Sequence, residues 1–249
     1  MNQSRPLIVG NWKMHGLSGD LSEVRRLKAA LDTRPCRARV AICPPATLIA
    51  RMAHILSGDG IEVGGQGCRP ETAGAFTGDV SPEMLADAGA RLVILGHSER
   101  RAGYGETNAD VAAKTLGALR AGLEPIICVG ETRAERDQGL ELKVVTDQIA
   151  GSAPRELDGH PFALAYEPIW AIGSGETPTL GEIEAVHEAM RGALESRFGP
   201  WGRETPILYG GSVKPDNAAQ ILASRNVGGA LVGGAALKAD DFLEIIRSA

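Results

Sequence analysis

The stretch Leu92-Val93-Ile94-Leu95-Gly96-His97 decides how the rest of the chain is interpreted. Four consecutive apolar residues, without the polar alternation of a solvent-facing strand, are typical of a strand covered on both faces. A glycine and a histidine follow where that strand should end. Seven further apolar runs, each followed by a polar or glycine-rich junction, occur along the chain: Leu7–Gly10, Val40–Cys43, Ile61–Gly64, Pro125–Val129, Phe162–Ala165, Ile207–Tyr209 and Ala230–Val232.

Amphipathic helical patterns separate these runs. From Leu17 to Leu31, leucine and valine recur at steps of three or four and predict one buried helical stripe. Thr179 and Glu182 have the spacing of a capping box, and Ser81 followed by proline marks another helix start. Gly122 should end the helix before it in a left-handed conformation.

Eight strands that alternate with helices predict repeated β-α units wound in the right-handed sense. No linker, low-complexity segment or block of like charge divides the 249 residues, so we expect a single domain over residues 1–249. The favoured α/β architecture is a closed (β/α)8 barrel with its site at the carboxyl ends of the strands. A doubly wound open sheet is the alternative, disfavoured because no Gly-x-Gly-x-x-Gly follows the first strand.

The composition excludes several functional classes. Apolar residues make up 43% and charged residues 23%, as in globular proteins. The net charge of -5 leaves no positive excess for nucleic acid or anionic lipid, so we expect neither partner. Apolar runs fall far short of the roughly 20 residues that span a bilayer. Four scattered cysteines and the lack of a secretory signal predict a soluble protein of the reducing cytoplasm.

Reactive side chains follow three of the predicted strands. Asn11 and Lys13 follow the first, where an amide and an ammonium suit an anionic, oxygenated substrate. His97 follows the fourth strand, and Glu167 follows the sixth, next to proline, isoleucine and tryptophan. Apolar walls should raise the pKa of the Glu167 carboxyl towards the range useful for a general base. Each residue also has an ordinary structural interpretation, as an exposed lysine, a buried histidine or an ion-pair partner.

Glycine-rich junctions predict where an anion would bind. Gly173 and Gly175 follow the sixth strand in a segment of small residues suited to a lid. Gly210-Gly211 and Gly233-Gly234 follow the last two strands, where glycine lets backbone N–H groups approach a phosphate closely. Barrel enzymes commonly hold phosphate in these two loops.

Together these motifs closely resemble the triosephosphate isomerase family, and the resemblance runs essentially end to end. It is carried, in the family's order, by Gly10–Met14, Gly74–Gly78, Gly96–Arg101, Cys128–Glu131, Tyr166–Ile172, Tyr209–Val213 and Val232–Gly234. The resemblance implies a homodimeric TIM barrel that interconverts dihydroxyacetone phosphate and D-glyceraldehyde 3-phosphate through an enediolate. It implies no cofactor and no metal, and a place in glycolysis and gluconeogenesis.

The resemblance also implies roles for individual residues. Glu167 is similar to the family's base, which moves a proton between two substrate carbons. His97 is similar to the family's neutral electrophile. Both roles are implied by the resemblance alone. Lys13 would supply positive charge near the phosphate and the developing enolate, and Asn11 would orient the same oxygens. Glu99 matches an acid that supports the site by pairing with Lys13 or Asn11.

Substrate binding is implied in the same way. The phosphate would lie on backbone N–H groups of Gly173, Gly233 and Gly234, with Ser212 as a further donor. Residues 168–179 resemble the lid that closes over phosphate and excludes water, and Tyr209 with Ser212 its latch.

Residues 66–79 resemble the loop that inserts into the other subunit of the dimer, with Thr77 reaching the region of the partner's Asn11. Gly67 departs from the asparagine common in the family. Glu176 departs from a lysine common in the lid, and we expect it to point into solvent. We expect Cys128 to pack as a small buried hydrophobic residue.

Three alternatives remain on the sequence alone. A related isomerase could act on a four-carbon ketose phosphate, although the intact lid favours three carbons. A barrel aldolase could use Lys13 as a Schiff base, although no apolar pocket for it is evident. An inactive barrel could serve only as a binding module, but Glu167, His97 and Lys13 are all present.

Overall fold

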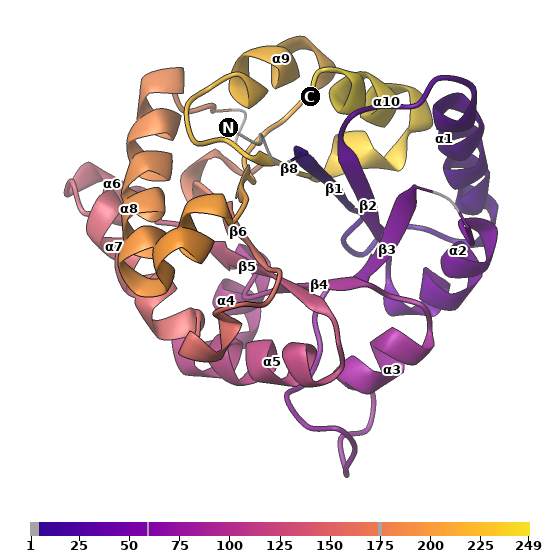
Figure 1. Ribbon diagram of the computed structural model, residues 1–249, viewed down its shortest axis with the longest axis horizontal. Helices are drawn as coiled ribbons and strands as arrows, with labels where there is room; N and C mark the ends of the chain where they lie inside the picture. The colour runs from indigo at the N-terminus through magenta and orange to yellow at the C-terminus, as the bar shows by residue number, and fades with distance from the viewer. Residues whose placement is uncertain (1–4, 59, 174–175) are drawn as a thin grey trace.

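The computed structural model describes residues 5–58, 60–173 and 176–249, so Gly175 of the predicted lid lies outside the described residues. Within them, eight parallel strands follow one another in sequence order and close into a barrel (Figure 1). The strands are β1 Leu7–Asn11, β2 Arg39–Cys43, β3 Ile61–Gly65, β4 Leu92–Leu95, β5 Glu124–Val129, β6 Ala163–Tyr166, β7 Ile207–Tyr209 and β8 Gly229–Val232. The predicted (β/α)8 TIM barrel is therefore confirmed.

Helices surround the strands on the outside (Figure 1). They are α1 Leu21–Thr33, α2 Ile49–Ile55, α3 Pro82–Asp87, α4 Ser98–Tyr104, α5 Asn108–Arg120, α6 Arg133–Asp137, α7 Glu141–Ser152, α8 Leu180–Glu204, α9 Pro215–Leu222 and α10 Ala239–Arg247. Short 3-10 turns are η1 Ser18–Asp20, η2 Ala46–Leu48, η3 Arg155–Leu157, η4 Ile169–Ala171 and η5 Gly234–Leu237. No helix in the described part of the chain is long and apolar enough to cross a membrane.

Pairing of β1 with β8 closes the barrel, with Leu7 opposite Gly229 and Gly10 opposite Val232. Glycine is required at the first of these contacts. Gly229 has a φ of +150°, and a Cβ there would lie 2.0 Å from the carbonyl oxygen of Leu7. The last strand can therefore approach the first because its leading residue has no side chain.

The strand predictions agree with the structure to within one residue at each end. The predicted helical stripe is wrong at its first position. Leu17 precedes η1 and is 78% exposed, whereas Leu21, Val24 and Leu27, which belong to α1, are buried. The spacing of the apolar residues did not show that a 3-10 turn, η1, lies between Leu17 and the start of α1.

Apolar side chains form two layers. One fills the barrel interior with alternate residues of the strands, and the other lies between the strands and the helices. The interior layer consists of Leu7, Val9, Ala41, Cys43, Leu92, Ile94, Ile126, Cys128, Ala163, Ala165, Leu208 and Leu231. Because this interior is packed with side chains, a small molecule can enter only at an end of the barrel.

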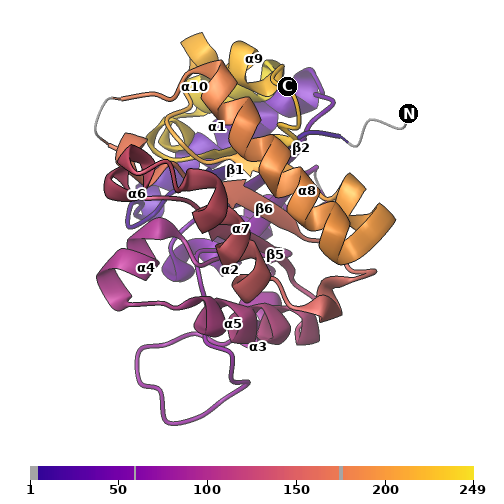
Figure 2. The same cartoon turned by 90° about the vertical axis from the view of Figure 1, so that its left-hand side faces the viewer.

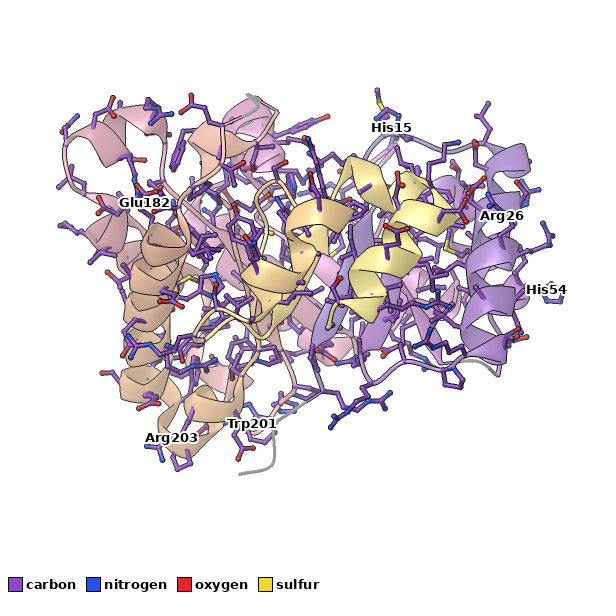
Figure 3. The ribbon with its side chains drawn as sticks, turned by 90° about the horizontal axis from the view of Figure 1, so that it is seen from above. His15, Arg26, His54, Glu182, Trp201 and Arg203 are labelled. Carbon is purple, nitrogen blue, oxygen red and sulfur yellow. The ribbon has the colours of Figure 1, made fainter. Side chains whose placement is uncertain are left out.

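Helix α8 spans the height of the barrel. Thr179 and Glu182 form the predicted capping box at its start, and Gly199, with a φ of 54°, interrupts it before Pro200. Figure 3 shows Glu182 and His15 towards one end of the molecule, and Arg203 at the other. The end that carries His15 is also the carboxyl end of β1, where the site is expected.

His187 of α8 is a buried polar residue of the outer layer. It is 0% exposed, its Nδ1 lies 3.2 Å from the carbonyl oxygen of Asn226, and its ring packs edge-on against Tyr166. Burial lowers the pKa of His187 to about 4. The imidazole is therefore neutral in the folded protein at neutral pH.

His187 should make folding stability fall with acid. The unfolded chain takes up a proton on this ring below a pH of about 6.5, whereas the folded chain does so only near pH 4. The contribution of about 3 kcal/mol is thus complete above pH 6.5 and is lost as the pH falls to 4. Urea unfolding of His187→Gln should show a flatter pH dependence in this window. The exposed His54→Gln is the control, and an equal flattening in that variant would contradict the assignment.

Candidate active site

The carboxyl ends of β1, β4 and β6 bring four of the predicted side chains to one cavity of about 520 Å³. These are Asn11, Lys13, His97 and Glu167. Glu99 does not line this cavity but faces an adjoining one of about 790 Å³, which Asn11, Lys13 and His97 also border. The predicted phosphate-binding residues Gly173, Ser212, Gly233 and Gly234 all line the smaller cavity.

Glu167 is 2% exposed and is held by hydrogen bonds from Ser98 and His97. The backbone N–H of Ser98 donates to Oε2 at 2.9 Å, and the Ser98 hydroxyl donates to Oε1 at 3.2 Å. Nε2 of His97 lies 2.9 Å from the same Oε1. These bonds occupy both carboxylate oxygens.

The expected upward pKa shift of Glu167 is wrong for this arrangement. Burial does raise the pKa of the carboxyl, but the hydrogen bonds donated by His97 and by the N–H of Ser98 outweigh it and leave the pKa below its usual range. The Cys128 thiol adds a further bond that favours the charged form. The sequence showed the apolar walls but not these donors, which come from a distant part of the chain.

His97 is held as a neutral ring by its neighbours. The backbone N–H of Glu99 donates to Nδ1 at 3.2 Å, so Nδ1 is an acceptor and the ring proton lies on Nε2. Nε2 therefore donates to Glu167 and points into the cavity. An N–H donor beside a carboxylate is the arrangement that proton transfer next to a carbonyl requires.

Lys13 has an unusual backbone conformation, with a φ of 52°. Asn11 accepts a hydrogen bond from its N–H at 3.0 Å, and Nε2 of Gln66 donates to its carbonyl at 2.8 Å. Nζ donates to Oε1 of Glu99 at 2.7 Å. Strain of this kind in a non-glycine residue is common at functional sites, where the surroundings hold the side chain in one place.

Gly130 allows β5 and β6 to approach at the level of Glu167. The N–H of Glu167 donates to the carbonyl of Val129 at 2.8 Å, and a Cβ on Gly130 would lie 1.7 Å from the carbonyl oxygen of Glu167. No side-chain rotation can relieve a contact with backbone. Glycine at this position therefore fixes the height of Glu167 in the barrel.

Gly130→Ala should displace Glu167 and lower turnover by about a hundredfold, because misplacement by about 1 Å is costly in catalysis. Overpacking should also lower stability by about 1–3 kcal/mol. Steady-state kinetics and thermal unfolding measure the two effects. Gly192→Ala, where a Cβ meets nothing within 4 Å, is the control. Full activity in Gly130→Ala would show that the base tolerates this shift.

The last two loops form a cradle of backbone. Gly234 begins η5, whose first N–H groups have no partner within the turn. A Cβ on Gly233 would lie 3.8 Å from Cε of Lys13, so the ammonium stem passes directly beside this loop. Backbone N–H groups and a fixed positive charge thus border the same cavity, as a phosphate requires.

Glu131 is a residue that the sequence analysis did not assign. It is 0% exposed, and its Oε1 accepts from Nε1 of Trp170 at 2.7 Å and from the hydroxyl of Tyr166 at 3.1 Å. Burial raises its pKa, although these donors oppose the shift. A carboxylate directly after an apolar strand and a glycine was the available signal. Glu131 anchors the segment that follows Glu167.

Glu176 is exposed to solvent, as we expected, but it also has a partner. Its carboxylate forms an ion pair with Arg133 of α6. Arg133 also lies over the ring of Trp170, 4.4 Å from the ring centroid. A residue near the tip of the predicted lid is therefore joined to the helix that follows β5.

At Gly67, a Cβ would lie 3.5 Å from Cδ of Arg100, an ordinary contact.

A buried carboxylate and an imidazole N–H, beside an ammonium and two glycine loops, define an enzyme that moves protons on a small anionic substrate. The family model described as triosephosphate isomerase matches residues 6–249. Triosephosphate isomerase of Caulobacter vibrioides is 56% identical, covering 98% of this chain and 96% of the relative. That of Jannaschia is 55% identical, covering 98% of both.

A crystal structure of triosephosphate isomerase from Bartonella henselae superposes with a TM-score of 0.92. It is 45% identical and covers 98% of this chain and 99% of the other. The chain belongs to the triosephosphate isomerase family.

Proposed function

We propose that this chain, acting as one domain, interconverts dihydroxyacetone phosphate and D-glyceraldehyde 3-phosphate, a step of glycolysis and gluconeogenesis. Membership of the family, with relatives more than half identical over nearly the whole chain, supports the activity. The observation that carries the mechanism is the 2.9 Å contact between Nε2 of His97 and Oε1 of Glu167. It supports the proposal because the side chains proposed as the base and the proton donor lie side by side at the cavity.

In this mechanism, Glu167 takes a proton from the substrate carbon next to the carbonyl, and the electron pair moves to form an enediolate. When the Glu167 carboxylate moves to the substrate, it leaves its hydrogen bonds with Ser98 and His97. The pKa of the carboxyl then rises, because the groups that favoured its charged form are lost while the carboxyl stays buried. Nε2–H of His97 then donates to the substrate oxygens. Glu167 then returns its proton to the adjacent carbon, the hydroxyl proton of the first substrate oxygen passes to the former carbonyl oxygen, and the isomerisation is complete.

Lys13 and Asn11 stabilise the negative charge that develops on the enediolate. The ammonium of Lys13 is fixed in place by Glu99, 2.7 Å away, and by the strained backbone described above. Fixed charges at the site of developing charge are the strongest catalytic aid available to a side chain. Glu99 is therefore proposed to act through Lys13.

Gly173, Ser212, Gly233 and Gly234 are proposed to hold the phosphate, since all four border the cavity next to Lys13. Residues 168–179 are proposed to close over it as a lid. The buried hydroxyl of Tyr209 has no hydrogen-bond partner among the described residues. That free hydroxyl supports a role for Tyr209, with Ser212, in holding the closed lid.

A coupled assay on dihydroxyacetone phosphate tests the proposal directly. Wild type should turn over the substrate, and Glu167→Gln should lose at least about a thousandfold in kcat, because no base remains to take the proton. Glu167→Asp should lose less, with little change in KM. A parallel assay on a four-carbon ketose phosphate addresses the alternative substrate. Equal activity of Glu167→Gln and wild type would exclude Glu167 as the base.

The chain is also proposed to form a homodimer. Residues 66–79 stand away from the barrel as a long loop, seen at the foot of Figure 2. Thr77 is exposed on this loop. The cavity of about 790 Å³ beside Lys13 is bordered by Met14, which is 93% exposed. A loop from a second copy would cover the exposed Met14 side chain and bring Thr77 of that copy near Lys13.

Sedimentation at falling protein concentration should show a dimer that dissociates into monomers. Assays at the same concentrations should show that the dimer is more active per chain than the monomer. Thr77→Arg should favour the monomer and lower kcat, because the loop tip would no longer fit beside the Lys13 strand end. Arg203→Ala, at the opposite end of the barrel, is the control (Figure 3). A fully active monomer would remove Thr77 from the site.

A reducing location, the cytoplasm, is proposed as well. The four cysteines are free thiols, and three of them are buried. Protein thiols that never pair are typical of that compartment.

A further inference from the structure

Arg101, in the last turn of α4, has a guanidinium that is bonded to neutral groups. Nε donates to the carbonyl of Gly96 at 2.8 Å, and Nη1 donates to Oδ1 of Asn108 at 2.7 Å. Nη2 donates to the carbonyl of Cys128 at 3.2 Å and to Oγ of Ser152 at 3.1 Å. Among the described residues, no carboxylate forms an ion pair with it.

These acceptors join the ends of two strands. Gly96 directly precedes His97 after β4, and Cys128 lies near the end of β5, beside Glu167. A Cβ on Gly96 would lie 2.9 Å from Nη2 of Arg101, so the glycine makes room for the guanidinium. One planar fork thus fixes the backbone on which His97 is mounted and the backbone that carries the thiol bonded to the base.

The charge of Arg101 is also unusual in its surroundings. The acidic groups that face it are Glu106, Glu167 and the Cys128 thiol. Glu106 already has two cations, Arg100 and Lys114, each 2.5 Å from its Oε1.

Glu167 has no fixed cation among its hydrogen-bond partners. His97 is neutral, the other donors are Ser98 and the Cys128 thiol, and Lys13 is paired with Glu99. Arg101, whose Nη2 lies 3.2 Å from the carbonyl oxygen of Cys128, is therefore a permanent positive charge near the catalytic carboxylate, with Cys128 between them.

We propose that Arg101 is a positioning residue for the isomerisation, which clamps the ends of β4 and β5 and keeps Glu167 ionised after it leaves Ser98 and His97. The inference rests on the role proposed for Glu167. Its physical basis is that a nearby cation favours the charged carboxylate, most strongly where water is excluded. The clamp and the charge are separable, because lysine keeps the charge but cannot reach four acceptors.

The test compares kcat over pH for wild type, Arg101→Met and Arg101→Lys. Arg101→Met should lower kcat at least about tenfold with KM changed less than about threefold, and its acid limb of kcat should move up by about half a pH unit or more. Arg101→Lys should keep the acid limb of wild type while kcat stays low. A change in the acid limb is a readout that a merely structural role would not produce.

Arg197→Met is the matched control, since Arg197 is likewise half-buried and donates to a backbone carbonyl, that of Ala153 at 2.7 Å. It should leave both kcat and the acid limb unchanged. A folded Arg101→Met with wild-type kcat and acid limb would overturn the proposal, and so would equal changes in the control.

If Arg101→Met does not fold, Arg101→Lys and Asn108→Ala carry the test of the clamp, and wild-type kcat in both would overturn it. The proposed function fails separately, through full activity of Glu167→Gln. Loss of the Arg101 effect alone leaves that function standing.

Discussion

The site depends on the burial of one carboxylate among donors that arrive from another part of the chain. An ionised group that is 2% exposed is tolerable only if hydrogen bonds replace the water it loses. For Glu167 these come from the N–H and hydroxyl of Ser98, at the first turn of α4, and from His97. The helix start also favours negative charge. The same bonds hold the carboxylate of Glu167, the proposed base, in one position.

Around this contact, the barrel restrains each group through backbone. Gly130 lets β5 approach Glu167, and Gln66 holds the carbonyl of a strained Lys13. Glu131 ties Trp170 to the end of β5, so the segment after the base begins from a fixed point. Precision at the mouth therefore comes from buried hydrogen bonds beneath the loops, while the loops supply glycine N–H groups.

Much of the molecule could be predicted because it rests on local pattern. Apolar runs such as Leu92–Leu95 specify strands buried on both faces, and the residue after each run must lie at the mouth. The direction of the pKa shift of Glu167 was predicted wrongly, and the ion pair of Glu176 with Arg133 was not predicted, since each depends on a group far away in the chain. Leu17 was misplaced because a 3-10 turn shifts the helix start without changing the apolar period. Glu131 and Gln66 were not assigned because their partners are not neighbours in sequence.

The amino-acid sequence by itself determined the alternation of strands and helices, their order around the barrel and the identity of the reactive groups. These follow from periodicity, from turn chemistry and from motifs that are contiguous in the chain. Only the tertiary structure decided the protonation of His97, the direction of the pKa shift of Glu167 and the place of the Arg101 charge. Those properties depend on distances and burial between residues up to about seventy positions apart, which no local pattern encodes.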